Sequence, residues 1–131
     1  MIVIDSSALL AILLREPEQQ DFQEIIAGSE RCVTSAVNAH ETATVLRLRH
    51  GPAAVPHFWR WLAESEIEIA PFDEAQVHVA AAAFNVYGKG IHSKARLNLS
   101  DCAAYALAKS LGAPLLFKGS DFAQTDLRRC V

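Results

Sequence analysis

The chain has 131 residues, of which 51% are hydrophobic, and a formal net charge of -3 at pH 7. This length is enough to bury one hydrophobic core and is short for two, so we expect a single domain over residues 1–131. The acidic balance excludes the strongly basic composition typical of non-specific nucleic-acid-binding proteins, so composition gives no reason to expect nucleic acid as a ligand.

The first half of the chain predicts two short strands and three helices. The apolar, β-branched run before Asp5 suits a strand buried on both faces. Pro17 fits the first turn of a helix, Gly28 fits its end, and Gly51-Pro52 ends a longer helix. The expected elements are a strand at 2–4, helices at 6–14 and 18–27, a strand at 32–34 and a helix at 35–50.

The second half predicts three more helices and two more strands. The first of these helices carries Val55, Phe58, Trp59 and Leu62 on one face, which predicts Phe58 and Trp59 in the core and leaves Trp61 for a partner contact. The remaining expected elements are a strand at 67–71, an alanine-rich helix from 73 to the glycines at 88 and 90, a polar loop through 98, a helix from 99 to Gly112, and a strand at 115–117.

Strands that alternate with helices predict an α/β fold. We expect a three-layer α/β/α sandwich with a central, mainly parallel sheet. In such sheets ligands bind beyond the carboxyl ends of the strands, so residues that directly follow a strand are the first candidates for a site.

The cysteines indicate a reducing compartment. Cys32, Cys102 and Cys130 are an odd number, lack metal-ligand spacing, and lie in or beside apolar runs, as buried free thiols do. The first apolar run is interrupted by Asp5 and by the polar segment 15–17, so we expect neither a secretion signal nor a membrane anchor. These features favour the cytoplasm.

Two aspartates follow predicted strands and should reach the same edge of the sheet. Asp5 comes after the first strand and Asp121 after the fourth. Either residue alone also fits an ordinary helix cap or turn. Asp101 lies three residues after Asn98 in the first turn of its helix, where reciprocal capping explains it equally well. Asp73 opens a helix in the same way, and we assign it to capping.

Glu41 is harder to explain by local structure. It shares a helical stripe with Val37, Val45 and Leu48, and an unpaired carboxylate on a buried apolar stripe costs free energy. Two explanations stay open at this point. Glu41 pairs with a base such as Arg47, or it faces a cleft.

The acids are more informative together than singly. Four acids from separate segments can converge on one edge of this topology, where their mutual repulsion needs a cation to offset it. Carboxylate oxygens are hard ligands that select Mg²⁺ or Mn²⁺. The sequence has no Cys/His spacing for zinc, no glycine-rich phosphate loop and no G-x-S-x-G motif. The pattern therefore favours metal-assisted phosphoryl chemistry at Asp5, Glu41, Asp101 and Asp121.

Four segments together form a specific pattern across nearly the whole chain. They are Ile4-Asp5-Ser6-Ser7-Ala8-Leu9, Glu41 in the third helix, Leu97 to Ala108, and Leu116 to Phe122 followed by Thr125-Asp126. This combination resembles the PIN-domain ribonucleases, in particular the VapC-type toxins of bacterial toxin-antitoxin pairs. The pattern departs from the family at two positions. Ser100 stands where glycine is frequent, and Ser93 stands where proline is frequent.

The resemblance implies a Mg²⁺-dependent endoribonuclease, with Mn²⁺ as a possible substitute. It further implies neutralisation by a small antitoxin protein and assembly as a homodimer. The catalytic and metal-binding roles fall on Asp5, Glu41, Asp101 and Asp121, and Ser7 and Asp126 are auxiliary candidates. Hydrolysis should leave 3′-hydroxyl and 5′-phosphate ends.

Local bases can hold the RNA backbone even though the net charge is acidic. Lys94 and Arg96 precede Asp101 in the polar loop, and Lys118 follows the fourth strand. For each of them an ordinary solvated charge is an equal explanation. Further candidates are Arg47, Arg49, Lys89 and His92.

Three other functions compete with the nuclease. An aspartate-nucleophile phosphatase needs a second Asp two residues after Asp5, where this chain has Ser7. A receiver-type signalling domain needs an acidic pair near the first strand and an acceptor Asp after a central strand, which Ile69-Ala70-Pro71 does not supply. A catalytically silent PIN-like module that binds RNA or protein stays open, because apparent ligands do not prove turnover.

Overall fold

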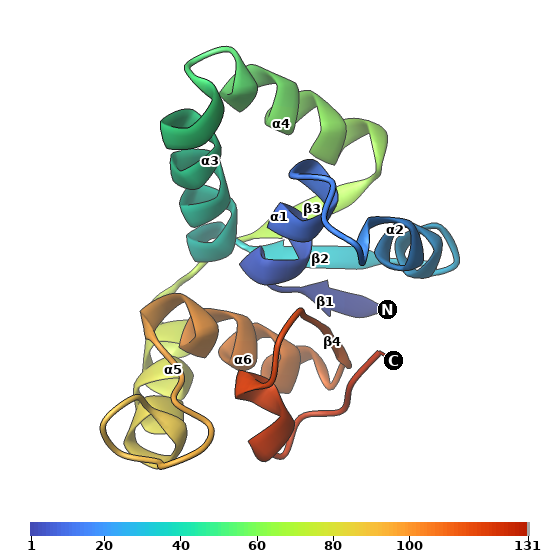
Figure 1. Cartoon of the computed structure of the whole chain (residues 1–131). Coiled ribbons are helices and arrows are strands. Elements are labelled where there is room, and N and C mark those ends of the chain that lie inside the picture. The colour runs from blue at the N-terminus through green and yellow to red at the C-terminus, as the bar shows by residue number, and fades with distance from the viewer. Residues whose placement is uncertain (131) are drawn as a thin grey trace.

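The structure is a computed structural model that describes residues 1–130. It confirms the predicted alternation of strands and helices (Figure 1). In chain order the elements are β1 (Ile2–Ile4), α1 (Ser6–Leu13), α2 (Gln19–Ala27), β2 (Cys32–Ser35), α3 (Ala36–His50), α4 (Ala54–Glu64), β3 (Ile67–Ala70), α5 (Glu74–Tyr87), α6 (Leu99–Leu111), β4 (Leu115–Leu116) and the 3₁₀ turn η1 (Asp121–Gln124).

The four strands form one parallel sheet in the order β3-β2-β1-β4. The pairs Val3–Leu115 and Ile4–Leu116 set the register between β1 and β4. Because these two strands are parallel neighbours, the chain leaves both at the same edge. The residues after β1 and after β4 therefore lie close together, as the sequence predicts.

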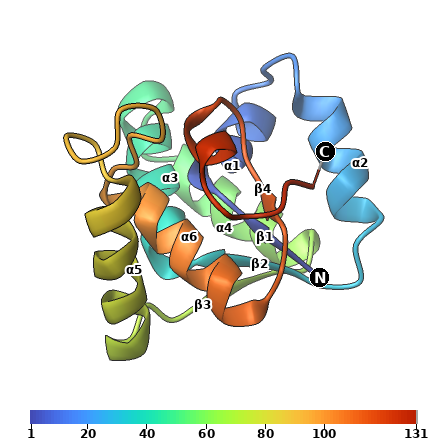
Figure 2. The ribbon, with the colours of Figure 1, turned by 90° about the horizontal axis from the view of Figure 1, so that it is seen from below.

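Helices cover both faces of the sheet and create two cores. Helices α1 to α4 lie on one face, and α5, α6 and η1 lie on the other (Figures 1 and 2). Successive residues of a strand point to opposite faces, so Ile2 and Ile4 join the first core and Val3 joins the second. This is the predicted α/β/α sandwich, and it explains why β1 and β4 are apolar throughout.

The prediction for α4 is wrong in part. Phe58 is fully buried, but Trp59 is 42% exposed. The buried stripe of α4 is Phe58 and Leu62, one helical turn apart, and Trp59 is rotated away from it. Trp61, predicted as a partner contact, is partly buried and packs against the first core, with its ring centroid 6.5 Å from that of Phe58.

Two helix starts differ slightly from the sequence prediction. Pro17 lies in the turn before α2 rather than within its first turn. Asp73 caps α5 as predicted, accepting a hydrogen bond from the Gln76 backbone amide at 3.1 Å. The Gln76 side chain does not complete the capping box: its Oε1 accepts no hydrogen bond within residues 1–130, and its Nε2 donates to Ser110 Oγ. None of the helices within residues 1–130 is both long and apolar enough to span a bilayer.

Candidate active site

Asp5 follows β1 directly and is the N-cap of α1. One of its carboxylate oxygens, Oδ2, accepts hydrogen bonds from the Ser7 amide at 3.0 Å and the Ser7 hydroxyl at 2.6 Å. Only 2% of Asp5 is exposed. Burial first, and then the nearby charges of Asp101 and Glu41, raise the pKa of this carboxyl to about 7 against the lowering effect of the Ser7 bonds.

Ser7 connects Asp5 to the chain after β4. Its hydroxyl donates to Asp5 and accepts from the backbone amide of Lys118 at 3.0 Å. The predicted auxiliary role of Ser7 thus has a geometric basis, because the hydroxyl fixes the carboxylate and the neighbouring strand end together. Lys118, predicted to contact RNA, is already used in two ion pairs, with Glu16 at 3.2 Å and Glu18 at 3.4 Å.

Asp101 lies in the first turn of α6 and does form the predicted capping box. Its Oδ2 accepts from the Asn98 amide at 2.9 Å, and its own amide donates to the Asn98 side chain at 2.9 Å. Besides capping the helix, Asp101 is affected by the other acids. Burial first, and then the charges of Asp121 and Glu41, raise the pKa of Asp101 to about 6, against the lowering effect of the Asn98 bond. Asp101 therefore interacts with every other acid of the candidate site.

Glu41 contacts a hydroxyl group from α6 and forms no ion pair within residues 1–130. Its Oε2 accepts a hydrogen bond from the Ser100 hydroxyl at 2.9 Å, and this side chain comes from the start of α6. The predicted apolar stripe around Glu41 is wrong, because Leu48 is 79% exposed. The buried face of α3 consists instead of Asn38, Ala39, Thr42, Ala43 and Leu46.

Asp121 is exposed and opens the short turn η1. Its charge acts on Asp101, but it makes no side-chain hydrogen bond among residues 1–130. The charges of Asp5, Glu41 and Asp101 thus act on one another. The exposed Asp121 acts on this group through its effect on the pKa of Asp101.

The donor set fits a hard divalent cation. All four candidates offer carboxylate oxygens, and two of them have raised pKa values because like charges and burial act on them. A cation would relieve both effects. Within residues 1–130, however, no three His, Cys, Asp or Glu side chains are placed closely enough to hold a metal as they stand. The acids therefore supply the right chemistry without forming a closed ligand shell.

Two further residues of the site were missed by sequence reasoning. The Asn38 side chain is fully buried and its amide nitrogen lies 3.4 Å from Asp5 Oδ1. Ser100 was noted only as a departure from the family pattern, yet it contacts Glu41. The available signal for Asn38 was its polarity three residues before Glu41, on the face of α3 that also carries Ala39.

Asp126 is not brought into the acid group. Its carboxylate accepts from Tyr105 Oη at 2.6 Å and from Lys109 Nζ at 2.8 Å. Both partners lie further along α6 than Asp101, and Lys109 forms an ion pair that lowers the pKa of Asp126. The contacts of Asp126 thus fix the C-terminal segment to α6 and give no support to the predicted auxiliary role.

His92, one of the predicted RNA contacts, holds the basic loop before α6 in place through two hydrogen bonds. His92 Nδ1 accepts from the backbone amides of Lys94 at 3.1 Å and Ala95 at 2.9 Å. Lys94 and Arg96 are exposed, and Arg96 adopts a left-handed backbone conformation with φ of 54°. Both side chains are therefore presented at the surface, shortly before Asp101 in the chain.

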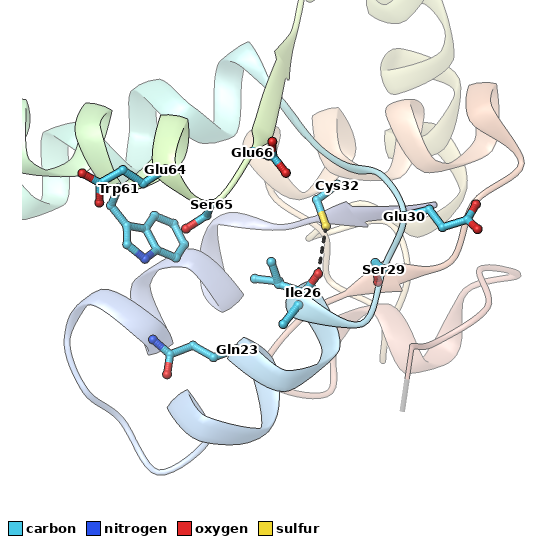
Figure 3. A pocket seen from close by; sticks show the side chains of 10 residues that line it. Gln23, Ile26, Ser29, Glu30, Cys32, Trp61, Glu64, Ser65 and Glu66 are labelled. Atoms are coloured by element: carbon cyan, nitrogen blue, oxygen red, sulfur yellow. Dashed lines mark hydrogen bonds between the residues drawn. The ribbon is translucent and has the colours of Figure 1, made fainter.

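A cavity of about 400 Å³ lies at the other end of the sheet (Figure 3). It is lined by residues of α2, α4 and the segments that enter β2 and β3, including Trp61 and Cys32. Cys32 is the first residue of β2, so this cavity opens at the amino edge of the strands. It contains none of the four acids and is separate from the candidate active site.

Comparison with known proteins confirms the family resemblance. The PIN domain family model matches residues 2–127. VapC ribonuclease Mb0640 of Mycobacterium bovis is 39% identical over 125 residues, which cover 95% of each chain. Ribonuclease VapC of Mycolicibacterium smegmatis is 40% identical over 125 residues, which cover 95% of this chain and 96% of the relative.

Solved structures show the same fold at lower sequence identity. The crystal structure of Mycobacterium tuberculosis VapC20, described as a Sarcin-Ricin loop cleaving toxin, has a TM-score of 0.79 at 15% identity and covers 97% of this chain and 96% of its own. VapBC2 from Rickettsia felis, bound to a promoter DNA fragment, has a TM-score of 0.73 at 14% identity over 98% and 96% of the two chains. The chain therefore belongs to the PIN-domain family, among the VapC-type ribonucleases.

Proposed function

We propose that this protein is a Mg²⁺-dependent endoribonuclease, able to use Mn²⁺, and the toxin of a VapBC-type toxin-antitoxin pair. One observation carries the proposal. Asp5 after β1, Glu41 on α3 and Asp101 on α6 come from three separate segments, which the contacts of Asn38 with Asp5 and Ser100 and of Ser100 with Glu41 bring together, and their charges act on one another. The relatives that are 39% and 40% identical over 95% of this chain are named VapC ribonucleases.

The residues that would hold the metal are Asp5, Glu41, Asp101 and Asp121. When bound, a divalent cation supplies activation of water and stabilisation of negative charge on the scissile phosphate. Ser7 keeps Asp5 in place through the hydrogen bonds to its Oδ2, so that the other carboxylate oxygen faces away from Ser7. The Asn98 amide does the same for Asp101. Both carboxylates are thus oriented before any ligand arrives, which lowers the reorganisation needed for catalysis.

The RNA backbone is held by exposed bases rather than by the net charge of the chain. Lys94 and Arg96 are our candidates, since both are exposed in the loop that leads into α6. Lys118 is a weaker candidate, because its ammonium group is shared by Glu16 and Glu18. Each phosphate contact of this kind adds to the salt dependence of binding.

The partners we propose are a small antitoxin protein and a second copy of the chain. Structures of similar fold include a toxin-antitoxin complex from Klebsiella pneumoniae, with a TM-score of 0.72 at 17% identity. The cytoplasm is the proposed compartment, because Cys32, Cys102 and Cys130 are free thiols.

Mapping of product ends tests the proposed activity. Purified protein without antitoxin is incubated with cellular RNA and Mg²⁺, and the new ends are sequenced. We expect discrete internal cuts with 3′-hydroxyl and 5′-phosphate ends that are absent when Asp5→Asn replaces the wild type. RNA that binds the wild-type protein but stays intact with both Mg²⁺ and Mn²⁺ would instead identify a catalytically silent PIN-like module.

A further inference from the structure

Asn38 is a fully buried residue of α3, and its side chain reaches the start of α1, which Asp5 caps, and the start of α6, which carries Asp101. Its amide nitrogen lies 2.8 Å from Ser6 Oγ, 3.1 Å from the Ser100 carbonyl oxygen and 3.4 Å from Asp5 Oδ1. The carbonyl oxygen only accepts hydrogen bonds, which fixes the orientation of the Asn38 amide. One side chain on α3 therefore connects the start of α1 to the start of α6.

The Asn38 side chain is more than a packing group. Its Oδ1 is buried and has no hydrogen-bond partner in the described part of the chain, and such an atom costs free energy. The neighbouring buried positions Ala39 and Ala43 are apolar. Thr42 satisfies its hydroxyl within α3 by donating to the backbone carbonyl of Asn38 at 2.8 Å. A polar group retained at this cost indicates that the contacts of its nitrogen matter.

Ser100 makes the second connection. Its hydroxyl has one hydrogen and lies 2.9 Å from Glu41 Oε2 and 3.0 Å from Asn98 Oδ1. Asn98 Oδ1 already accepts from the Asp101 amide, and an ionised carboxylate is the stronger acceptor. The hydroxyl hydrogen is therefore directed to Glu41. A glycine at this position, frequent in the family pattern, could not make this bond.

We propose that Asn38 and Ser100 are positioning residues that join α1, α3 and α6 and so hold Asp5 and Glu41 beside Asp101. The inference rests on the proposed function, because it treats these acids as metal ligands. Hydrogen-bonded partners of metal ligands typically change metal affinity or activity by about 10- to 100-fold when they are removed. Neither residue needs to touch RNA to have this effect.

Mn²⁺ titration by calorimetry, without RNA, tests the role of Ser100. We expect Ser100→Ala to bind Mn²⁺ roughly 10-fold more weakly than wild type. Ser110→Ala is the matched control, since Ser110 lies on the same helix and its hydroxyl donates to the Ala106 carbonyl and accepts from Gln76 Nε2, neither of which belongs to the acid group. In cleavage assays the Ser100→Ala defect should shrink as Mn²⁺ is raised, while the KM for RNA stays at the wild-type value.

Asn38→Ala gives the second arm, with Thr42→Val as a control that is equally buried on the same helix. Asn38→Ala should weaken Mn²⁺ binding by a similar factor, and Thr42→Val should not. If Asn38→Ala fails to fold by circular dichroism, Ser100→Ala alone decides. A folded Ser100→Ala that binds Mn²⁺ within twofold of an active wild type overturns this inference and leaves the proposed function intact. If the wild type neither binds metal nor cleaves RNA, both this inference and the proposed function are wrong.

Discussion

Asp5→Asn should remove the pH dependence that the buried carboxyl imposes on the stability of the metal-free fold. The pKa of Asp5 is about 7 in the folded chain against an ordinary 3.8. The folded state therefore holds this proton more tightly, so its contribution to stability is complete below pH 3.8 and is lost as pH rises through 7. The total loss is about 4 kcal/mol, of which roughly 2 to 3 kcal/mol falls between pH 5 and pH 8.

Thermal melts in chelator at pH 5 and pH 8 measure this effect. Asparagine is nearly isosteric, remains a good N-cap and carries no charge, so the variant escapes the loss. For a chain of this size 1 kcal/mol corresponds to roughly 3 to 4 °C. The melting temperature of Asp5→Asn relative to wild type should therefore rise by roughly 6 to 12 °C between the two pH values. An unchanged difference would refute the assignment of a buried carboxyl with a raised pKa at Asp5.

Three further changes test other parts of the structure. Phe58→Ala should lower the free energy of unfolding by about 3 to 5 kcal/mol in urea titrations, because the ring is fully buried, and a loss below about 1 kcal/mol would contradict the core assignment. Asp126→Asn should cost at most about 1 kcal/mol, since its partner Lys109 is half-exposed, and should leave the Mg²⁺-induced stabilisation unchanged; a lost Mg²⁺ response would restore Asp126 to the site. Arg96→Glu should weaken RNA binding and flatten its salt dependence, and an unaltered salt slope would place the RNA track elsewhere.

Local sequence patterns predicted the sheet edge and three of its acids well. Short apolar strands and glycine or proline stops are local features, so the positions of Asp5, Asp101 and Asp121 relative to strands and helices followed from them. The capping roles of Asp73 and Asn98 were also predicted, because a cap depends on residues three positions apart.

Contacts between distant segments could not be predicted in the same way. Helical spacing shows which residues share a face of α3, but not which face packs against α6, so Glu41 was placed on the wrong stripe and Asn38 was missed. The sequence around Lys118 predicts an RNA contact, because its ion-pair partners Glu16 and Glu18 lie far away in the chain and cannot be identified from local spacing. The Asp126 pairing with Tyr105 depends on how the C-terminal segment folds back onto α6.

Cleavage of RNA by the purified protein, measured across a Mg²⁺ titration after treatment with chelator, tests the central claim most directly. The comparison includes wild type, Asp101→Asn and the capping control Asp73→Asn. We predict that wild type and Asp73→Asn lose activity in chelator and regain it with Mg²⁺, while Asp101→Asn stays inactive at every concentration. Cleavage that persists in chelator, or Asp101→Asn activity equal to that of Asp73→Asn, would contradict a metal-dependent nuclease built on these acids.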